Sequence, residues 1–78
     1  SYDKALELKP DYYEAWYFRG NVMGNLGRYS EAVASYDKAL ELKPDYYEAW
    51  YFRGNVMEIL GRHSEAVASF KQATKLEI

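Results

Sequence analysis

Apolar residues recur every three or four positions along most of the chain, with polar and charged residues between them. This spacing places the apolar side chains on one face of an α-helix. Two Lys-Pro-Asp segments, at 9–11 and 43–45, interrupt the pattern, because proline cannot continue a helix and disfavours helical backbone in the residue before it. The pattern predicts five helices, and their expected bounds are about 2–9, 12–26, 29–43, 46–60 and 63–76.

The expected helix ends carry their own signals. Asp11 is followed three residues later by Glu14, and Asp45 by Glu48, which predicts a capping box at the start of two helices. Two glycines stand where a left-handed residue commonly ends a helix, and these are Gly27 and Gly61. The connections between the segments are short, so we expect successive helices to be antiparallel neighbours.

Helical spacing also predicts which residues form the core. In the segment 12–26 one stripe holds Trp16, Gly20 and Met23, flanked by Ala15, Phe18, Val22 and Leu26. The following segment aligns Ala32, Tyr36 and Ala39, beside Val33 and Leu40. The same pattern returns later with Trp50, Gly54, Met57, Ala66, Phe70 and Ala73. Large and small side chains on facing stripes can interdigitate, and glycine allows two helices to approach closely.

A long internal repeat explains why the pattern returns. Residues 1–23 recur without change as residues 35–57, an offset of 34 residues. A fixed period of this size is typical of stacked repeats, in which each unit buries its apolar face only against its neighbours. We therefore expect one array over 1–78: a trailing helix of a preceding repeat at 1–10, a full repeat at 11–44 and a final repeat at 45–78. The chain opens in mid-repeat, which suggests a fragment of a longer array, either natural or designed.

These spaced residues resemble the tetratricopeptide repeat family, whose 34-residue unit carries W-x2-L-G-x2-Y, then A-x3-F and a later proline. The matching residues are Trp16, Gly20, Ala32, Tyr36, Ala39 and Pro44, then Trp50, Gly54, Ala66, Phe70 and Ala73. Arginine three residues after each tryptophan departs from the family's leucine and is similar to a bacterial, especially cyanobacterial, variant. Met23 and Met57 stand where the family prefers tyrosine. The resemblance implies an all-α fold of antiparallel helix pairs, stacked in a right-handed superhelical solenoid with a concave groove.

The arginines in this departure, Arg19 and Arg53, predict a contact between consecutive units. A half-buried guanidinium requires an acceptor, because an unpaired buried charge costs several kcal/mol. Asp3 and Asp37 each precede one of these arginines by the same distance, so we expect Asp3–Arg19 and Asp37–Arg53 pairs. The third equivalent of the aspartate is Lys71, after which no further arginine needs a partner. The alternative is that each arginine is a solvated surface residue.

Composition excludes several functional classes. The net charge of −2, with both signs interleaved, predicts no nucleic-acid interface. No apolar run reaches the length of a membrane span, and no cysteine is present. We expect no membrane association and a reducing, cytoplasmic location. His63 is the single histidine and has no serine, cysteine or second histidine to form a catalytic group with it. We expect no enzymatic activity, no cofactor and no metal, since capping explains the acidic pairs better than a cation site.

The resemblance also implies which residues line the groove. Matching the family's groove positions to this chain gives Tyr12, Glu14, Tyr17, Asn21, Asn25, Tyr46, Glu48, Tyr51, Asn55 and Ile59. Tyrosine rings and asparagine amides suit an apolar or neutral peptide, and the expected central contacts are Tyr17, Tyr51, Asn21 and Asn55. A carboxylate-binding groove of the kind some family members use is not expected, because Glu14 and Glu48 would repel the ligand. For Tyr12 and Tyr46 the alternative is packing between adjacent units.

The expected function is a protein–protein interaction scaffold that binds a peptide or helical segment of a partner protein in this groove. The alternative is a self-assembling structural array whose ends stack on neighbouring chains. Leu76 and Ile78 stand where the next Pro-Asp restart would be, and repeat arrays usually need polar end caps for solubility. We therefore also expect weak homo-oligomerisation through the ends of the array.

Overall fold

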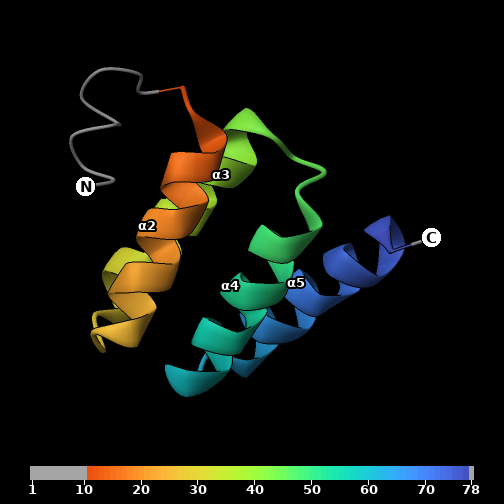
Figure 1. The fold of residues 1–78 in the computed structure, drawn as a ribbon. Helices are drawn as coiled ribbons and strands as arrows, with labels where there is room; N and C mark the ends of the chain where they lie inside the picture. The colour runs from red at the N-terminus through yellow and green to blue at the C-terminus, as the bar shows by residue number, and fades with distance from the viewer. Residues whose placement is uncertain (1–10, 78) are drawn as a thin grey trace.

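The computed structural model describes residues 11–77, which form two antiparallel helix pairs lying side by side (Figure 1). The first pair is α2 (Tyr13–Asn25) and α3 (Tyr29–Leu42), and the second is α4 (Tyr47–Ile59) and α5 (His63–Leu76). The largest interfaces lie within each pair, and α3 packs against α4 to join the two. The all-α class and four of the predicted helices are confirmed. The helix predicted at 2–9 lies outside the described residues.

The predicted glycine signals are confirmed at the ends of α2 and α4. Gly27 and Gly61 have φ angles of 78° and 76°, in the left-handed region. The N–H of Arg28 donates to the Met23 carbonyl at 2.8 Å, and the N–H of Arg62 donates to the Met57 carbonyl at 2.9 Å. These bonds satisfy carbonyls that the ending helix would otherwise leave unpaired. The same glycine motif thus turns the chain within both pairs.

The capping boxes predicted with Asp11 and Asp45 are wrong. Tyr12 and Tyr46 hold the N-cap positions, and neither makes a side-chain capping bond. Before α4 the Tyr46 N–H donates to the Lys43 carbonyl at 3.1 Å, which closes a turn around Pro44 and Asp45. Proline favours this turn position, and the Trp50 indole N–H donates to the Pro44 carbonyl at 2.8 Å. The turn therefore places the aspartate one residue too early to cap the helix.

Glycine allows the two helices of each pair to approach closely. A Cβ on Gly20 would lie 2.6 Å from the Tyr36 ring, and one on Gly54 would lie 2.6 Å from the Phe70 ring. Both distances are shorter than carbon–carbon van der Waals contact, so no larger residue fits without displacing the ring. Small side chains complete the predicted core around these contacts, and the buried alanines are Ala15, Ala32, Ala39, Ala49, Ala66 and Ala73.

The prediction that Phe18, Val22 and Leu26 flank the core is wrong, because all three are exposed on α2. Two of the equivalents have different surroundings, since Val56 is buried and Leu60 packs against the core, whereas Phe52 is exposed like Phe18. The reason is that α3 covers this face of α4, whereas none of the helices α3–α5 covers the corresponding face of α2. Across residues 11–77, no helix is long and apolar enough to cross a membrane.

Candidate functional site

A hollow of about 420 Å³ lies between the first helices of the two pairs, α2 and α4. Four of the ten residues predicted for the groove line it, and these are Asn21, Asn25, Asn55 and Ile59. Five residues that the sequence did not assign to the groove complete the lining, namely Gly24, Tyr29, Tyr36, Phe52 and Val56. The structure therefore brings the C-terminal halves of the predicted groove helices together. Tyr29 and Tyr36 were missed because they belong to α3, the second helix of its pair.

The polar side chains that line this hollow are asparagine amides and tyrosine phenols. Among the described residues that line it, none carries a charge. An uncharged surface gives no compensation for burying an ionic ligand group, which costs free energy unless it is paired. The geometry therefore suits a ligand with apolar side chains and neutral hydrogen-bonding groups.

A tyrosine from α3 fixes one of these amides. The Tyr36 hydroxyl donates to Oδ1 of Asn21 at 2.5 Å. Burial raises the pKa of Tyr36 well above its ordinary value, and the neighbouring Tyr17 acts in the same direction. The hydroxyl therefore keeps its proton and remains a hydrogen-bond donor to Asn21.

The two tyrosines predicted as central contacts lie in different environments. Tyr17 is only 9% exposed, with its ring centroid 4.9 Å from that of Tyr46 and 6.1 Å from those of Tyr36 and Phe52. Tyr51 is 42% exposed on α4. The second pair covers Tyr17, whereas no further pair in residues 11–77 covers Tyr51. The expectation that Tyr17 is an open groove contact thus needs correction, because Tyr17 packs between the pairs.

The other predicted groove residues lie near the N-terminal ends of the same helices. Tyr46 packs between the units, 5.3 Å from Tyr13 in an edge-to-face contact, and the Lys43 ammonium lies within 5.3 Å of both ring centres. Desolvation raises the pKa of Tyr46 to about 12, with smaller effects from Tyr17 and nearby carboxylates. Tyr12, Glu14 and Glu48 are exposed. None of these residues lines the hollow.

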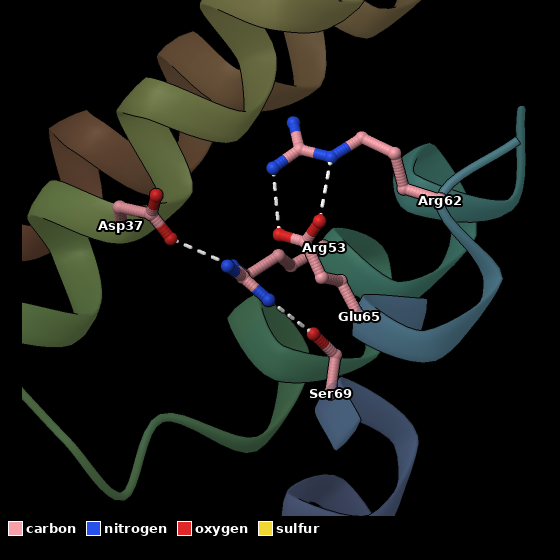
Figure 2. A network of polar contacts seen from close by, with 5 residues as sticks. All are labelled: Asp37, Arg53, Arg62, Glu65 and Ser69. Carbon is pink, nitrogen blue, oxygen red and sulfur yellow. Dashed lines mark hydrogen bonds and ion pairs between the residues drawn. The ribbon is translucent and has the colours of Figure 1, made fainter. Parts of the chain in front are cut away.

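The predicted pair between consecutive units is confirmed at Arg53 (Figure 2). Its Nε lies 2.6 Å from Oδ1 of Asp37 on α3, and its Nη1 donates to Oγ of Ser69 on α5 at 2.5 Å. One guanidinium on α4 therefore connects three helices. The corresponding Arg19 donates to Oγ of Ser35 at 2.6 Å. Asp3, its predicted partner, lies outside the described residues.

Sequence reasoning missed the two serines, Ser35 and Ser69, both of which are fully buried. A signal for them was present, because each serine follows its arginine by 16 residues. A buried hydroxyl needs a hydrogen-bond partner, and the arginine supplies it. Near the start of α5, Arg62 also pairs with Glu65 through two bonds, of 2.8 and 2.6 Å (Figure 2). The Arg53–Asp37 contact joins the two pairs, and none of these bonded residues lines the hollow.

His63 lies at the surface, where its Nδ1 is 3.1 Å from a carboxylate oxygen of Glu58. Its side chain is highly exposed and contacts no other histidine. Within residues 11–77, no group of three or more metal-binding side chains gathers in one place.

Comparison with known proteins gives a consistent result. Two family models described as tetratricopeptide repeat match the chain, one over residues 24–76 and one over residues 1–34. A crystal structure of MamA is similar, with a TM-score of 0.95 and 32% identity over 97% of this chain. Structures of MamA AMB-1 and MamA MSR-1 have TM-scores of 0.91 and 0.92, at 33% and 32% identity over 96% and 97% of this chain. The chain spans 44% of each of these three MamA chains. No curated protein matches the sequence.

Proposed function

Because the chain belongs to the tetratricopeptide repeat family, we propose that it is a protein-interaction scaffold that holds a segment of a partner protein against α2 and α4. The observation that carries the proposal is the uncharged hollow between these helices, with its three asparagine amides. The proposal assigns no catalysis to the chain. Its role is to present a shaped surface on a stack of rigid helix pairs.

The chemistry of the hollow specifies the partner segment. Phe52, Val56 and Ile59 offer an apolar floor, and Asn21 and Asn55 offer hydrogen bonds beside it. An apolar side chain of the partner gains free energy by leaving water, at about 25 cal/mol for each Å² buried. The partner's main-chain groups can then pair with the amides. An uncharged, apolar peptide segment therefore fits better than a C-terminal carboxylate.

A charge placed in the hollow tests this proposal. The probe is a set of peptides selected from a displayed random library for binding to the full chain. Ile59 is 59% exposed, so Ile59→Glu leaves the core intact while placing a carboxylate where the peptide would bury it. Since an unpaired buried charge is costly, we expect affinity to fall by at least about tenfold, measured by fluorescence anisotropy.

Val67→Glu is the matched control, because Val67 on α5 is also apolar and 50% exposed but does not line the hollow. Affinity for the selected peptides should stay within about twofold of the original, since surface substitutions away from a site have small effects. Equal binding to the original chain and to Ile59→Glu would contradict the groove proposal. Loss of binding with Val67→Glu alone would move the site to α5.

A second candidate is the self-assembling array, and two exposed valines favour it. Val33 on α3 is buried on the same face as Asp37, and Val56 on α4 is buried beside α3. Their equivalents in the repeat, Val67 on α5 and Val22 on α2, are exposed. Packing α5 of one copy on α2 of another, as α3 packs on α4, would cover both side chains.

The valines provide the test of this stacking. Val22→Glu places a carboxylate in the proposed apolar contact and should weaken self-association in sedimentation-velocity experiments over a range of concentrations, because an unpaired charge is costly to bury. A strict monomer for the original chain would contradict this candidate.

A further inference from the structure

The two asparagines of the hollow hold the same position in their helices but face different residues. Asn21 on α2 and Asn55 on α4 lie within identical sequence, since residues 13–23 repeat as 47–57. The second helices differ at one position that matters here, because α3 has Tyr36 where α5 has Phe70. The first unit therefore combines its asparagine with a phenol, and the second unit combines the equivalent asparagine with a phenyl ring.

The two rings sit in the same place relative to their glycines. A Cβ on Gly20 would lie 2.6, 2.8 and 3.0 Å from three atoms of the Tyr36 ring. A Cβ on Gly54 would lie 2.6, 2.8 and 2.9 Å from the same three atoms of the Phe70 ring. The Phe70 ring therefore rests on α4 as the Tyr36 ring rests on α2, and the missing hydroxyl is the relevant difference.

This hydroxyl changes what each amide can offer a ligand. A side-chain amide has one carbonyl oxygen that accepts and one NH₂ group that donates. The Tyr36 hydroxyl takes up one of the two lone pairs on Oδ1 of Asn21, so the NH₂ group of Asn21 is the part of this amide that is left fully available to a ligand. Across residues 11–77, none of the side-chain hydrogen bonds involves Asn55. Asn55 lines the hollow, and within the described part of the chain neither its Oδ1 nor its Nδ2 is engaged by another side chain.

We infer that Asn55 is the anchoring residue of the groove and pairs at two points with a main-chain amide of the bound segment. Its Oδ1 accepts the partner's N–H, and its Nδ2 donates to the partner's C=O. Asn21 adds a single donor. This inference rests on the proposed function and gives the groove a direction, because the two-point contact lies on α4 and the one-point contact on α2.

The neighbouring side chains agree with a peptide as the occupant. Phe52, Val56 and Ile59 lie in the same hollow as Asn55 and would seat an apolar side chain next to the paired amide. A ligand that covers Asn55 without pairing it would leave a buried polar group unsatisfied, which costs more than one net hydrogen bond gains. A neutral amide beside an apolar side chain satisfies both requirements.

The test uses N-acetyl-leucine N′-methylamide, a neutral probe with two peptide groups and one apolar side chain. The full chain is labelled with ¹⁵N, and the side-chain NH₂ signals of the asparagines are followed by NMR as the probe is added. We expect the Asn55 signals to shift most, with smaller changes at Asn21. Phe70→Tyr places a hydroxyl beside Asn55 and should weaken binding about fivefold, the loss expected for one net hydrogen bond.

Tyr36→Phe is the matched reciprocal variant. It frees Oδ1 of Asn21 and should increase the response of the Asn21 signals to the probe. Asn55→Leu removes both hydrogen bonds at similar volume and should weaken binding more than Phe70→Tyr does. Circular dichroism checks that each variant is folded. The Asn55 NH₂ shift without probe reports whether the hydroxyl of Phe70→Tyr has bonded to the amide.

The outcomes separate this inference from the proposed function. If backbone signals of Phe52 and Ile59 shift with the probe while those of Asn55 do not, the groove binds and the inference is wrong. The inference is also wrong if Asn55→Leu binds the probe as tightly as the original chain. If no signal of the hollow shifts up to the solubility of the probe, both the proposed function and the inference are contradicted.

Discussion

The helices α2 and α4 have identical sequences over residues 13–23 and 47–57 and bury the same alanine, glycine and methionine, yet each also buries one residue that the other exposes. Tyr17 is buried where Tyr51 is exposed, and Val22 is 38% exposed where Val56 is 5% exposed. The pair that follows α2 covers its tyrosine, and the pair that precedes α4 covers its valine. Burial in this chain is therefore a property of neighbouring units as well as of sequence, as expected when each repeat contacts only its neighbours.

Truncating the two tyrosines should give the largest difference. Tyr17→Ala removes an aromatic ring from the junction of the pairs and should lower the free energy of unfolding by about 3–5 kcal/mol. Tyr51→Ala removes an exposed ring with the same sequence neighbours and should cost less than about 1 kcal/mol. Urea unfolding followed by circular dichroism measures both. Equal losses would show that the second pair does not protect Tyr17.

Truncating the two valines should give a smaller difference in the free energy of unfolding. The larger loss is now expected on α4, whereas for the tyrosines it is expected on α2. Val56→Ala removes two buried methyl groups beside α3 and should cost about 2 kcal/mol, from the transfer of those groups and the cavity left behind. Val22→Ala should cost less than about 0.5 kcal/mol, as an exposed substitution. The same unfolding experiment measures both. A loss at Val22 equal to that at Val56 would mean that another surface covers α2 in solution.

The comparison also explains how far the sequence predicts this molecule. Helix bounds, the glycine ends at Gly27 and Gly61, and the Asp37–Arg53 pair follow from local chemistry and from the repeat period, so they could be predicted. The burial of Tyr17 could not, because the identical Tyr51 is exposed and only the stacking of units distinguishes them. The capping boxes failed for a local reason, since the turn at Pro44 moves the helix start by one residue.

The candidate site also contains residues that the sequence predicts and residues that it does not. The family pattern predicted Asn21, Asn25, Asn55 and Ile59, all from the first helices, and these line the hollow. Tyr36 on α3 also lines the hollow, and its hydroxyl bonds to Asn21. The spacing of Tyr36 predicts a core residue, so this contact could not be predicted from the sequence. The sequence shows that Phe70 replaces Tyr36 in the second unit. Only the structure shows that both rings lie in the same place against their glycines, so that the hydroxyl is the difference between the two asparagine sites.

The pair that joins the units should show measurable coupling. Asp37→Ala and Arg53→Leu, made singly and together, form a double-mutant cycle for a bond between one exposed and one mostly buried side chain. We expect a coupling free energy of about 1 kcal/mol in urea unfolding, decreasing with salt. Loss of the Ser69 bond occurs in both arms that carry Arg53→Leu and therefore cancels.

Asp45→Ala provides the matched control for this cycle, because Asp45 is an exposed acidic residue with no described bond to Arg53. Its effect should add to that of Arg53→Leu within about 0.5 kcal/mol. Additive effects for Asp37 and Arg53 as well would show that the pair does not stabilise the junction.

The smallest expected difference concerns the ion pairs near the starts of α3 and α5. Arg62 bonds both carboxylate oxygens of Glu65, whereas Arg28 bonds a single oxygen of Glu31. Hydrogen bonds from Arg62 hold the pKa of Glu65 below its ordinary value, and the charges of Arg62 and Arg53 act in the same direction. Two-point pairing of this kind fixes the geometry better than a single contact.

A depressed pKa in the folded state gives a defined dependence of stability on pH. The unfolded chain protonates Glu65 near the ordinary value of about 4.3, whereas the folded chain holds the ionised form to lower pH. The contribution of Glu65 to stability is therefore complete above the unfolded pKa and is lost as pH falls through the folded pKa. Urea unfolding between neutral and acidic pH should show a weaker acid loss for Glu65→Gln than for the original chain. Arg62→Gln should reduce the loss in the same way, because it removes the cause of the shift. Parallel pH profiles for all three proteins would show that this pair contributes nothing to the difference between the two units.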